Sequence, residues 1–128
     1  MRASIDGFHR PRAERYRRGD ASPEGYYRDA FDYDAVRAVL LEPLWPGEDR
    51  RYRTSVFDLH ADAPTDETWS VAAADALVLV DGVFLLRPEL APRWDFRILV
   101  DADRDERLRR ARERDASLFG SPEAVRDR

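Results

Sequence analysis

Two aspartates, each followed by a glycine, are the residues of this sequence whose surroundings suggest chemistry. Asp81 follows the apolar run 76–80, ALVLV, whose lack of polar alternation predicts a strand buried on both faces of a parallel sheet. A carboxylate at the C-terminal end of such a strand lies where open α/β sheets bind ligands. In nucleotide-binding α/β proteins, an acid at this position holds Mg²⁺ or a water of its shell. The alternative is that Asp81 caps the next segment and that Gly82 makes a turn.

Asp6 occupies a similar position, because it follows the short apolar segment 3–5. Two such acids on neighbouring parallel strands would face one crevice. Close carboxylates disfavour the ionisation of both unless a cation or a hydrogen-bond donor lies between them. Mg²⁺ with a substrate hydroxyl would fill that position, whereas the alternative for Asp6-Gly7 is a simple turn.

Composition narrows the classes of protein that this sequence can encode. Its 128 residues are 43% hydrophobic, which is enough for the core of one domain. Charged residues of both signs make up 38% and give a net charge of −4, which argues against a general nucleic-acid-binding surface. There is no cysteine, and no apolar run is long enough to cross a bilayer. Without a visible signal peptide, we expect a cytoplasmic protein without a membrane or nucleic-acid partner.

Lysine is absent, because all 22 residues counted as lysine or arginine are arginines. A phosphate-binding loop of the form G-x-x-x-x-G-K-[ST] is therefore not part of these 128 residues.

The apolar patterns predict strands that alternate with helices, and hence an α/β fold with a largely parallel sheet flanked by helices. We expect strands at 76–80 and 96–100 to be parallel neighbours in one sheet with 3–5. The remaining predictions are a surface loop over 11–28, a helix over 35–41 capped by Asp32 or Asp34, a strand over 52–59, a loop over 61–70, a short helix over 88–94, a helix over 104–114 with a capping box of Asp103 and Glu106, and a further helix from Ser121.

A series of motifs, in order along the chain, resembles the uridine kinase-like P-loop kinases, a family that also takes in the type I pantothenate kinases. The similarity extends over nearly the whole sequence. The motifs are Asp6-Gly7-Phe8-His9, Arg18-Gly19, Phe31-Asp32, Val56-Phe57-Asp58, Leu79-Val80-Asp81-Gly82-Val83, and Val100-Asp101-Ala102-Asp103 followed by Arg107-Leu108, Arg110 and Arg114-Asp115.

This resemblance implies a P-loop NTPase-like fold and phosphoryl transfer from ATP, with Mg²⁺, to a hydroxyl of a nucleoside or similar small molecule. Asp6 would orient or deprotonate the acceptor hydroxyl, and Asp81 would help to hold Mg²⁺ and the acceptor. Arg110 and Arg114 would reach the triphosphate, since guanidinium groups suit phosphate oxygens. The implied candidates for the acceptor pocket are Phe8, His9, Tyr27, Phe31, Arg53 and His60.

The sequence also departs from the family. The first strand, phosphate loop and first helix of the family have no counterpart in residues 1–128, and neither has its C-terminal end. Ala111 replaces the second arginine of an Arg-Arg pair, and the family's histidine is displaced to His60. We therefore expect a single, incomplete kinase-like domain that is inactive alone. The sequence does not identify the acceptor, which could be uridine, pantothenate or another alcohol, and a homo-oligomer is compatible with it.

Three other interpretations remain open. Asp58, His60 and Asp62 could bind a metal together with His9. The arginine-rich segment 104–114 could bind RNA or acidic lipid, but interleaved acids favour a solvated helix face. Finally, the chain could be a kinase-like module that binds a small molecule or a partner without catalysis.

Overall fold

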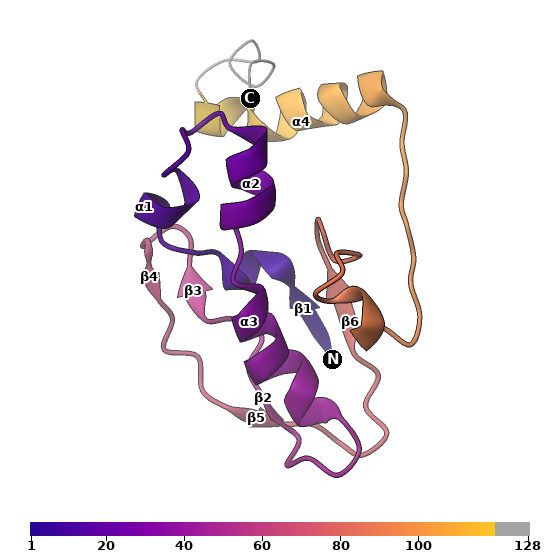
Figure 1. The fold of residues 1–128 in the computed structure, drawn as a ribbon. Helices are drawn as coiled ribbons and strands as arrows, with labels where there is room; N and C mark the ends of the chain where they lie inside the picture. The colour runs from indigo at the N-terminus through magenta and orange to yellow at the C-terminus, as the bar shows by residue number, and fades with distance from the viewer. Residues whose placement is uncertain (120–128) are drawn as a thin grey trace. The chain divides into compact units, whose positions relative to one another are not determined.

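The computed structural model describes residues 1–119 and is drawn in Figure 1. It divides into two compact units, Met1–Trp94 and a second unit that begins at Asp95, and each is described by itself. The helix predicted from Ser121 lies outside the described residues. None of the described helices is long and apolar enough to cross a membrane.

A parallel pair of strands, β1 (Arg2–Ser4) and β6 (Leu79–Asp81), joins the start of the first unit to residues almost 80 positions later (Figure 1). The register pairs Ala3 with Val80 and Ser4 with Asp81. This pairing confirms that the two segments are parallel neighbours in one sheet.

The prediction that residues 76–80 are buried on both faces is wrong. The strand begins only at Leu79, which is 54% exposed, and Leu77 is 82% exposed. Ala3 is buried and its partner Val80 packs on the core, so one face of the pair is covered. Side chains of a strand alternate between faces, which leaves Arg2, Leu79 and Asp81 on the open face.

The core of the first unit lies between the covered face of this strand pair and a long helical segment. That segment begins as α3 (Tyr33–Ala35), continues in the wider π-type turns of η2 (Val36–Leu41) and ends in the 3₁₀ turn η3 (Glu42–Leu44). The Asp32 carboxylate accepts a hydrogen bond from the Ala35 amide at 2.9 Å, which confirms the predicted helix and its cap. The largest fully buried side chains are Phe8, Phe31, Ile5, Leu40, Leu90 and Val36.

Residues 11–28 contain two helices, so the prediction of a loop is wrong. They are α1 (Arg12–Arg15) and α2 (Pro23–Asp29). The Ser22 hydroxyl caps α2 by accepting from the Gly25 amide at 3.1 Å, and Pro23 occupies the first turn. The buried Asp29 carboxylate binds Arg17 at 2.5 Å and Arg18 at 2.7 Å, and these ion pairs connect the end of α2 to the turn that follows α1. Cap and ion pairs thus replace the apolar stripe that the sequence lacks.

The predicted strand 52–59 is in fact two short strands. β2 (Arg51–Tyr52) pairs antiparallel with β5 (Ser70–Val71), and β3 (Phe57–Asp58) pairs antiparallel with β4 (Ala63–Pro64). The predicted loop 61–70 therefore contains β4 and the start of β5. Residues 54–56 leave the ladder because they pack on the 3₁₀ turn η1 (Ile5–Phe8), where the Val56 amide donates to the Gly7 carbonyl at 2.8 Å. The predicted helix 88–94 is reduced to the 3₁₀ turn η4 (Ala91–Arg93).

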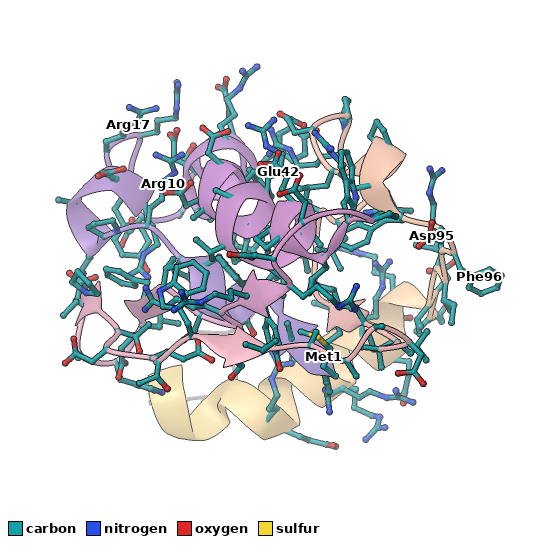
Figure 2. All side chains as sticks on the ribbon, turned by 90° about the horizontal axis from the view of Figure 1, so that it is seen from below. Met1, Arg10, Arg17, Glu42, Asp95 and Phe96 are labelled. Atoms are coloured by element: carbon teal, nitrogen blue, oxygen red, sulfur yellow. The ribbon has the colours of Figure 1, made fainter. Side chains whose placement is uncertain are left out.

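In the second unit, the prediction of a buried strand at 96–100 is wrong. These residues form no strand, and Phe96, Ile98, Leu99 and Val100 are between 72% and 87% exposed. Figure 2 shows Phe96 extending away from the ribbon. An apolar run becomes a buried strand only where another strand and a covering layer meet it, and no described strand pairs with this run.

The helix predicted after Asp103 is present as α4 (Arg104–Phe119). The Asp103 carboxylate accepts from the Asp105 amide at 2.9 Å, as expected at a helix start. The Glu106 carboxylate binds Arg109 and Arg110 along the helix, so the reciprocal half of the predicted capping box stays a prediction. Exposed charged pairs of this kind agree with the expected solvated face.

Candidate active site

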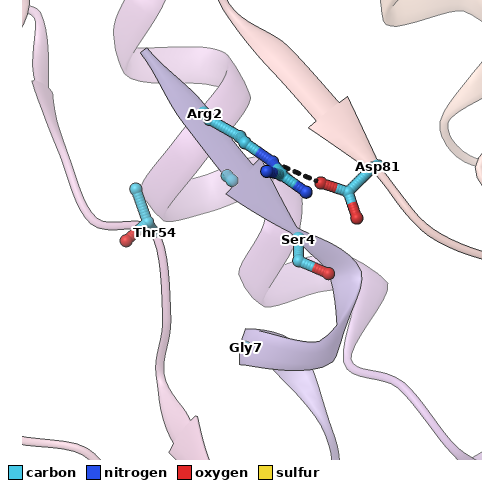
Figure 3. Close-up of a pocket in the computed structure, with 6 residues that line it drawn as sticks. Arg2, Ser4, Gly7, Thr54 and Asp81 are labelled. Atoms are coloured by element: carbon cyan, nitrogen blue, oxygen red, sulfur yellow. Dashed lines mark hydrogen bonds and ion pairs between the residues drawn. The ribbon is translucent and has the colours of Figure 1, made fainter. Parts of the chain in front are cut away.

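A shallow cleft of about 360 Å³ lies on the open face of the parallel pair, at the end where both strands finish (Figure 3). β1, β6, the η1 turn and the segment after β2 contribute its walls. The residues that line it are Arg2, Ala3, Ser4, Gly7, Thr54 and Asp81.

Asp81 projects into this cleft and pairs with the first residue of β1. The Arg2 Nε donates to Asp81 Oδ1 at 3.0 Å, as Figure 3 shows, and the Arg2 and Asp81 side chains are 75% and 47% exposed. An exposed ion pair is weak, so a cation can displace the guanidinium from the carboxylate. Mg²⁺ is commonly bound through one or two carboxylates together with phosphate oxygens and water, and Asp81 fits that chemistry.

Asp6 lies in the η1 turn, directly after β1. Its amide donates to the Ser4 hydroxyl at 3.3 Å, and Ser4 is the residue that pairs with Asp81 across the sheet. The parallel register thus brings the two Asp-Gly pairs to the same end of the sheet. Among the predicted site residues, only Asp81 lines the cleft, and a shared ligand of the two acids stays a prediction.

Each of these aspartates is followed by a glycine that the packing requires. A Cβ atom on Gly7 would lie 2.7 Å from the Thr54 carbonyl oxygen. On Gly82 it would lie 2.1 Å from Cγ2 of the buried Ile5, and Gly82 also has φ of +142°. Both Asp-Gly dipeptides therefore do more than reverse the chain direction. The missing side chain of each glycine lets another segment of the cleft wall pack against the backbone beside the acid.

The aromatic candidates for the acceptor pocket divide between the core and the surface. Phe8 and Phe31 are fully buried, so they support the η1 turn from inside. The His9 ring lies 4.5 Å from the Phe31 ring, and its Nδ1 is 2.8 Å from the Asp6 carbonyl oxygen. Tyr27 on α2 is 41% exposed, with the Arg87 guanidinium 4.2 Å from its ring centre.

The structure does not bring Arg53 or His60 into the lining of the cleft. Arg53 Nη2 donates to the Thr65 carbonyl at 2.8 Å and stacks near Trp69. His60 is exposed, and its amide donates to the Asp58 carboxylate at 2.8 Å. This bond and a second from the Ala61 amide lower the pKa of Asp58, the Ala61 bond most strongly. Within residues 1–119, no group of three or more acids and histidines could hold a metal ion by itself, which leaves the metal interpretation of this loop without support.

The two arginines predicted to bind phosphate, Arg110 and Arg114, lie on α4 in the second unit. Arg110 Nε binds Glu106 at 2.6 Å and its side chain is 69% exposed. Their role toward a triphosphate stays a prediction.

Of the six residues that line the cleft, only Asp81 was a predicted site residue, and three of the five others have polar side chains: Arg2, Ser4 and Thr54. The alternation of β1 carries a signal for the first two, because Arg2 and Ser4 flank the buried Ala3 and must share the opposite face. Thr54 has no such signal, since it reaches the cleft through a break in a strand.

A solved structure described as a possible uridine kinase from Bacillus stearothermophilus matches this fold with a TM-score of 0.67. The match covers 84% of this chain and 57% of that chain at 23% sequence identity. Together with the parallel pair and its flanking helices, this likeness assigns the chain to the P-loop NTPase-like α/β fold.

The sequence comparison finds a curated relative with a similar description of activity. Uridine-cytidine kinase B of Dictyostelium discoideum is 31% identical over 116 residues, which make up 91% of this chain and 46% of that protein. The chain is therefore similar in sequence to a uridine-cytidine kinase, and it spans about half the length of this relative. No family model matches the sequence.

Proposed function

We propose that the cleft serves the acceptor side of ATP-dependent phosphorylation of a hydroxyl on a nucleoside or a similar small molecule. The observation that carries this proposal is the parallel register of β1 and β6, with Ser4 opposite Asp81 and Asp6 in the η1 turn that follows Ser4. Two carboxylates at one end of a parallel sheet are suited to a cation and a hydroxyl in the same crevice. The relationship to uridine kinases supports a nucleoside as the acceptor. Cytoplasmic location is part of the same proposal.

In the proposed reaction, the acceptor oxygen bonds to the γ-phosphorus of ATP while the bond from that phosphorus to the bridging oxygen of ADP breaks. Asp6 orients the acceptor hydroxyl and takes its proton. Asp81 would hold Mg²⁺, which supplies positive charge to neutralise the phosphate oxygens when it is bound. Arg110 and Arg114 are proposed to contact the triphosphate, and His9 and Tyr27 are proposed to contact the acceptor.

These residues account less well for binding of ATP, the phosphate donor, than for binding of the acceptor. A chain without lysine has no G-x-x-x-x-G-K-[ST] loop to surround the β-phosphate. We therefore expect residues 1–128 alone to bind an acceptor but to show negligible turnover. The test is calorimetric titration with uridine, cytidine and pantothenate, followed by a phosphorylation assay with ATP and Mg²⁺. Robust turnover by these residues alone would refute the donor-side argument, and failure to bind any of the three compounds would contradict the acceptor proposal.

The second candidate is a kinase-like module that binds a small molecule without catalysis, and the absence of lysine is the observation that favours it. The coding DNA upstream of Met1 distinguishes the two candidates. An in-frame G-x-x-x-x-G-K-[ST] segment, with turnover by the extended protein against a panel of hydroxyl compounds, favours the enzyme. An upstream sequence without it favours the binding module. In an active extended protein, Asp6→Asn should lower turnover far more than it weakens ATP binding.

A further inference from the structure

We propose that Glu67 is a positioning residue of this cleft. It holds the segment Thr54-Ser55 against the Asp6-Gly7 turn and so sets the shape of the cleft. The consequence for acceptor binding rests on the function proposed above. The positional role itself rests only on contacts within the first unit.

The Glu67 carboxylate accepts four hydrogen bonds from Thr54 and Ser55, one from each backbone amide and one from each hydroxyl. The two backbone amides donate to Oε2, from Thr54 at 3.0 Å and from Ser55 at 2.5 Å. The two hydroxyls donate as well, from Thr54 to Oε1 at 2.6 Å and from Ser55 to Oε2 at 2.9 Å. One side chain thus replaces the strand partner that residues 54–55 lack between β2 and β3.

The electrostatics of this contact favour the ionised carboxylate. Burial alone would raise the pKa of Glu67, but the hydrogen bonds from Thr54 and Ser55 outweigh burial and lower it. Hydrogen bonds to a charged group are stronger than neutral ones, and four of them converge here. Glutamine keeps the size of the side chain but is neutral, so the bonds from Thr54 and Ser55 lose the assistance of the carboxylate charge.

The fixed segment forms a wall of the cleft. The Thr54 carbonyl oxygen and the Ser55 Cβ lie so close to Gly7 that a Cβ there would be 2.7 Å and 2.8 Å from them. The Val56 amide donates to the Gly7 carbonyl at 2.8 Å, which joins the same segment to the turn that carries Asp6. Thr54 and Gly7 both line the cleft with Asp81. A displacement of residues 54–55 therefore changes the space beside both acids.

Glu67 is itself held in place from the other side. The Thr65 hydroxyl accepts from the Glu67 amide at 3.3 Å, and the Thr65 amide donates to the Val56 carbonyl at 3.0 Å. Arg53 Nη2 donates to the Thr65 carbonyl at 2.8 Å. The segment that carries the Glu67 carboxylate is thus held in place by its own hydrogen bonds. A residue that positions others needs such support.

The experiment compares amide hydrogen exchange and uridine binding in the wild-type chain, Glu67→Gln, Glu67→Ala and the neighbouring surface variant Asp66→Asn, by NMR of the ¹⁵N-labelled protein. In both Glu67 variants, we expect exchange at Thr54, Ser55 and Val56 to accelerate at least tenfold, while amides of the β1–β6 pair keep their protection. Uridine affinity should fall about tenfold or more. Added formate should partly restore protection and affinity in Glu67→Ala, because it supplies the missing carboxylate. Asp66→Asn should match the wild type.

Unchanged protection at residues 54–56 in Glu67→Ala would overturn the proposal. Exchange that accelerates equally throughout the first unit in both variants would also overturn it, because Glu67 would then be a general stabilising residue. If the wild-type chain binds no uridine, the proposed nucleoside function fails, whereas the exchange data still decide the positional role of Glu67.

Discussion

At the scale of single residues, the glycines after Asp6 and Asp81 determine how closely other segments approach the two acids. Gly82 lies against Ile5, which is itself 1% exposed and belongs to the core. The position of Asp81 is therefore coupled to core packing through the backbone of its neighbour. The same contact makes the glycine difficult to replace, because Ile5 cannot move without disturbing the core.

Gly82→Ala should destabilise the first unit by about 2–4 kcal/mol, since it combines an unfavourable φ with a steric clash against Ile5. The matched control is Gly19→Ala, because Gly19 also has a positive φ, +101°, but no atom lies within 4 Å of the position of its Cβ. The control should cost only about 1 kcal/mol. Urea unfolding followed by fluorescence measures both values, and equal losses would contradict the role given to the Ile5 contact.

If Asp81 binds a divalent cation as proposed, Arg2 competes with that cation for the carboxylate, which gives a second prediction at this scale. Arg2→Gln removes an exposed ion pair worth about 0.5–1 kcal/mol, so Mn²⁺, used in place of Mg²⁺, should bind about two- to fivefold more tightly. Paramagnetic broadening of the Gly82 amide signal measures this binding. Asp81→Asn should abolish the broadening, and Mn²⁺ affinity unchanged by Arg2→Gln would contradict the competition.

At the scale of elements, short helices begin at polar caps instead of following long apolar stripes. Asp32 accepts from the Ala35 amide at the start of α3, where its carboxylate replaces a missing intrahelical partner. Asp32→Ala should lower the free energy of unfolding by about 1 kcal/mol. Asp34→Ala is the control, because that side chain is 82% exposed and forms a surface pair with Arg37, and it should cost less than about 0.5 kcal/mol. Similar losses for the two variants in chemical denaturation would argue against the cap.

α4 depends on charge pairs along its surface. Hydrogen bonds from Arg109 and then Arg110 lower the pKa of Glu106 to about 2, from an ordinary value of 4.5. Because the folded pKa is depressed, the stabilisation is fully present above pH 4.5 and is lost as the pH falls through about 2. A ¹³C-detected NMR titration of the Glu106 carboxyl should show this low midpoint, and Arg109→Gln should raise it. A midpoint near 4.5 in the wild type would mean that the pairs do not persist in solution.

At the scale of the whole molecule, the sequence predicts those features that depend on local chemistry. The Asp32 cap, the helix after it, the start of α4 and the parallel pairing of residues 3–5 with the run before Asp81 agree with the structure. The exposure of apolar side chains in 76–80 and 96–100 could not be predicted, because an apolar run does not show whether another element of the fold covers it. The position of Thr54 in the cleft wall was missed for a related reason. It depends on the contacts of Thr54 and Ser55 with Glu67, twelve or thirteen positions later, and no periodic pattern in the sequence indicates such contacts.

The exposed apolar run in the second unit leads to the last prediction. Phe96, Ile98, Leu99 and Val100 are consecutive or nearly so, rich in β-branched and aromatic side chains, and more than 70% exposed. Such a segment tends to associate with copies of itself, because pairing satisfies its backbone and removes apolar surface from water. We expect the chain to self-associate at micromolar concentrations in sedimentation velocity, and Ile98→Asp to shift it toward the monomer. Val71→Asp, at a single apolar residue with 71% exposure, should leave self-association unchanged. A wild-type chain that stays monomeric at 100-fold higher concentration, or equal effects of the two substitutions, would show that this run does not mediate association.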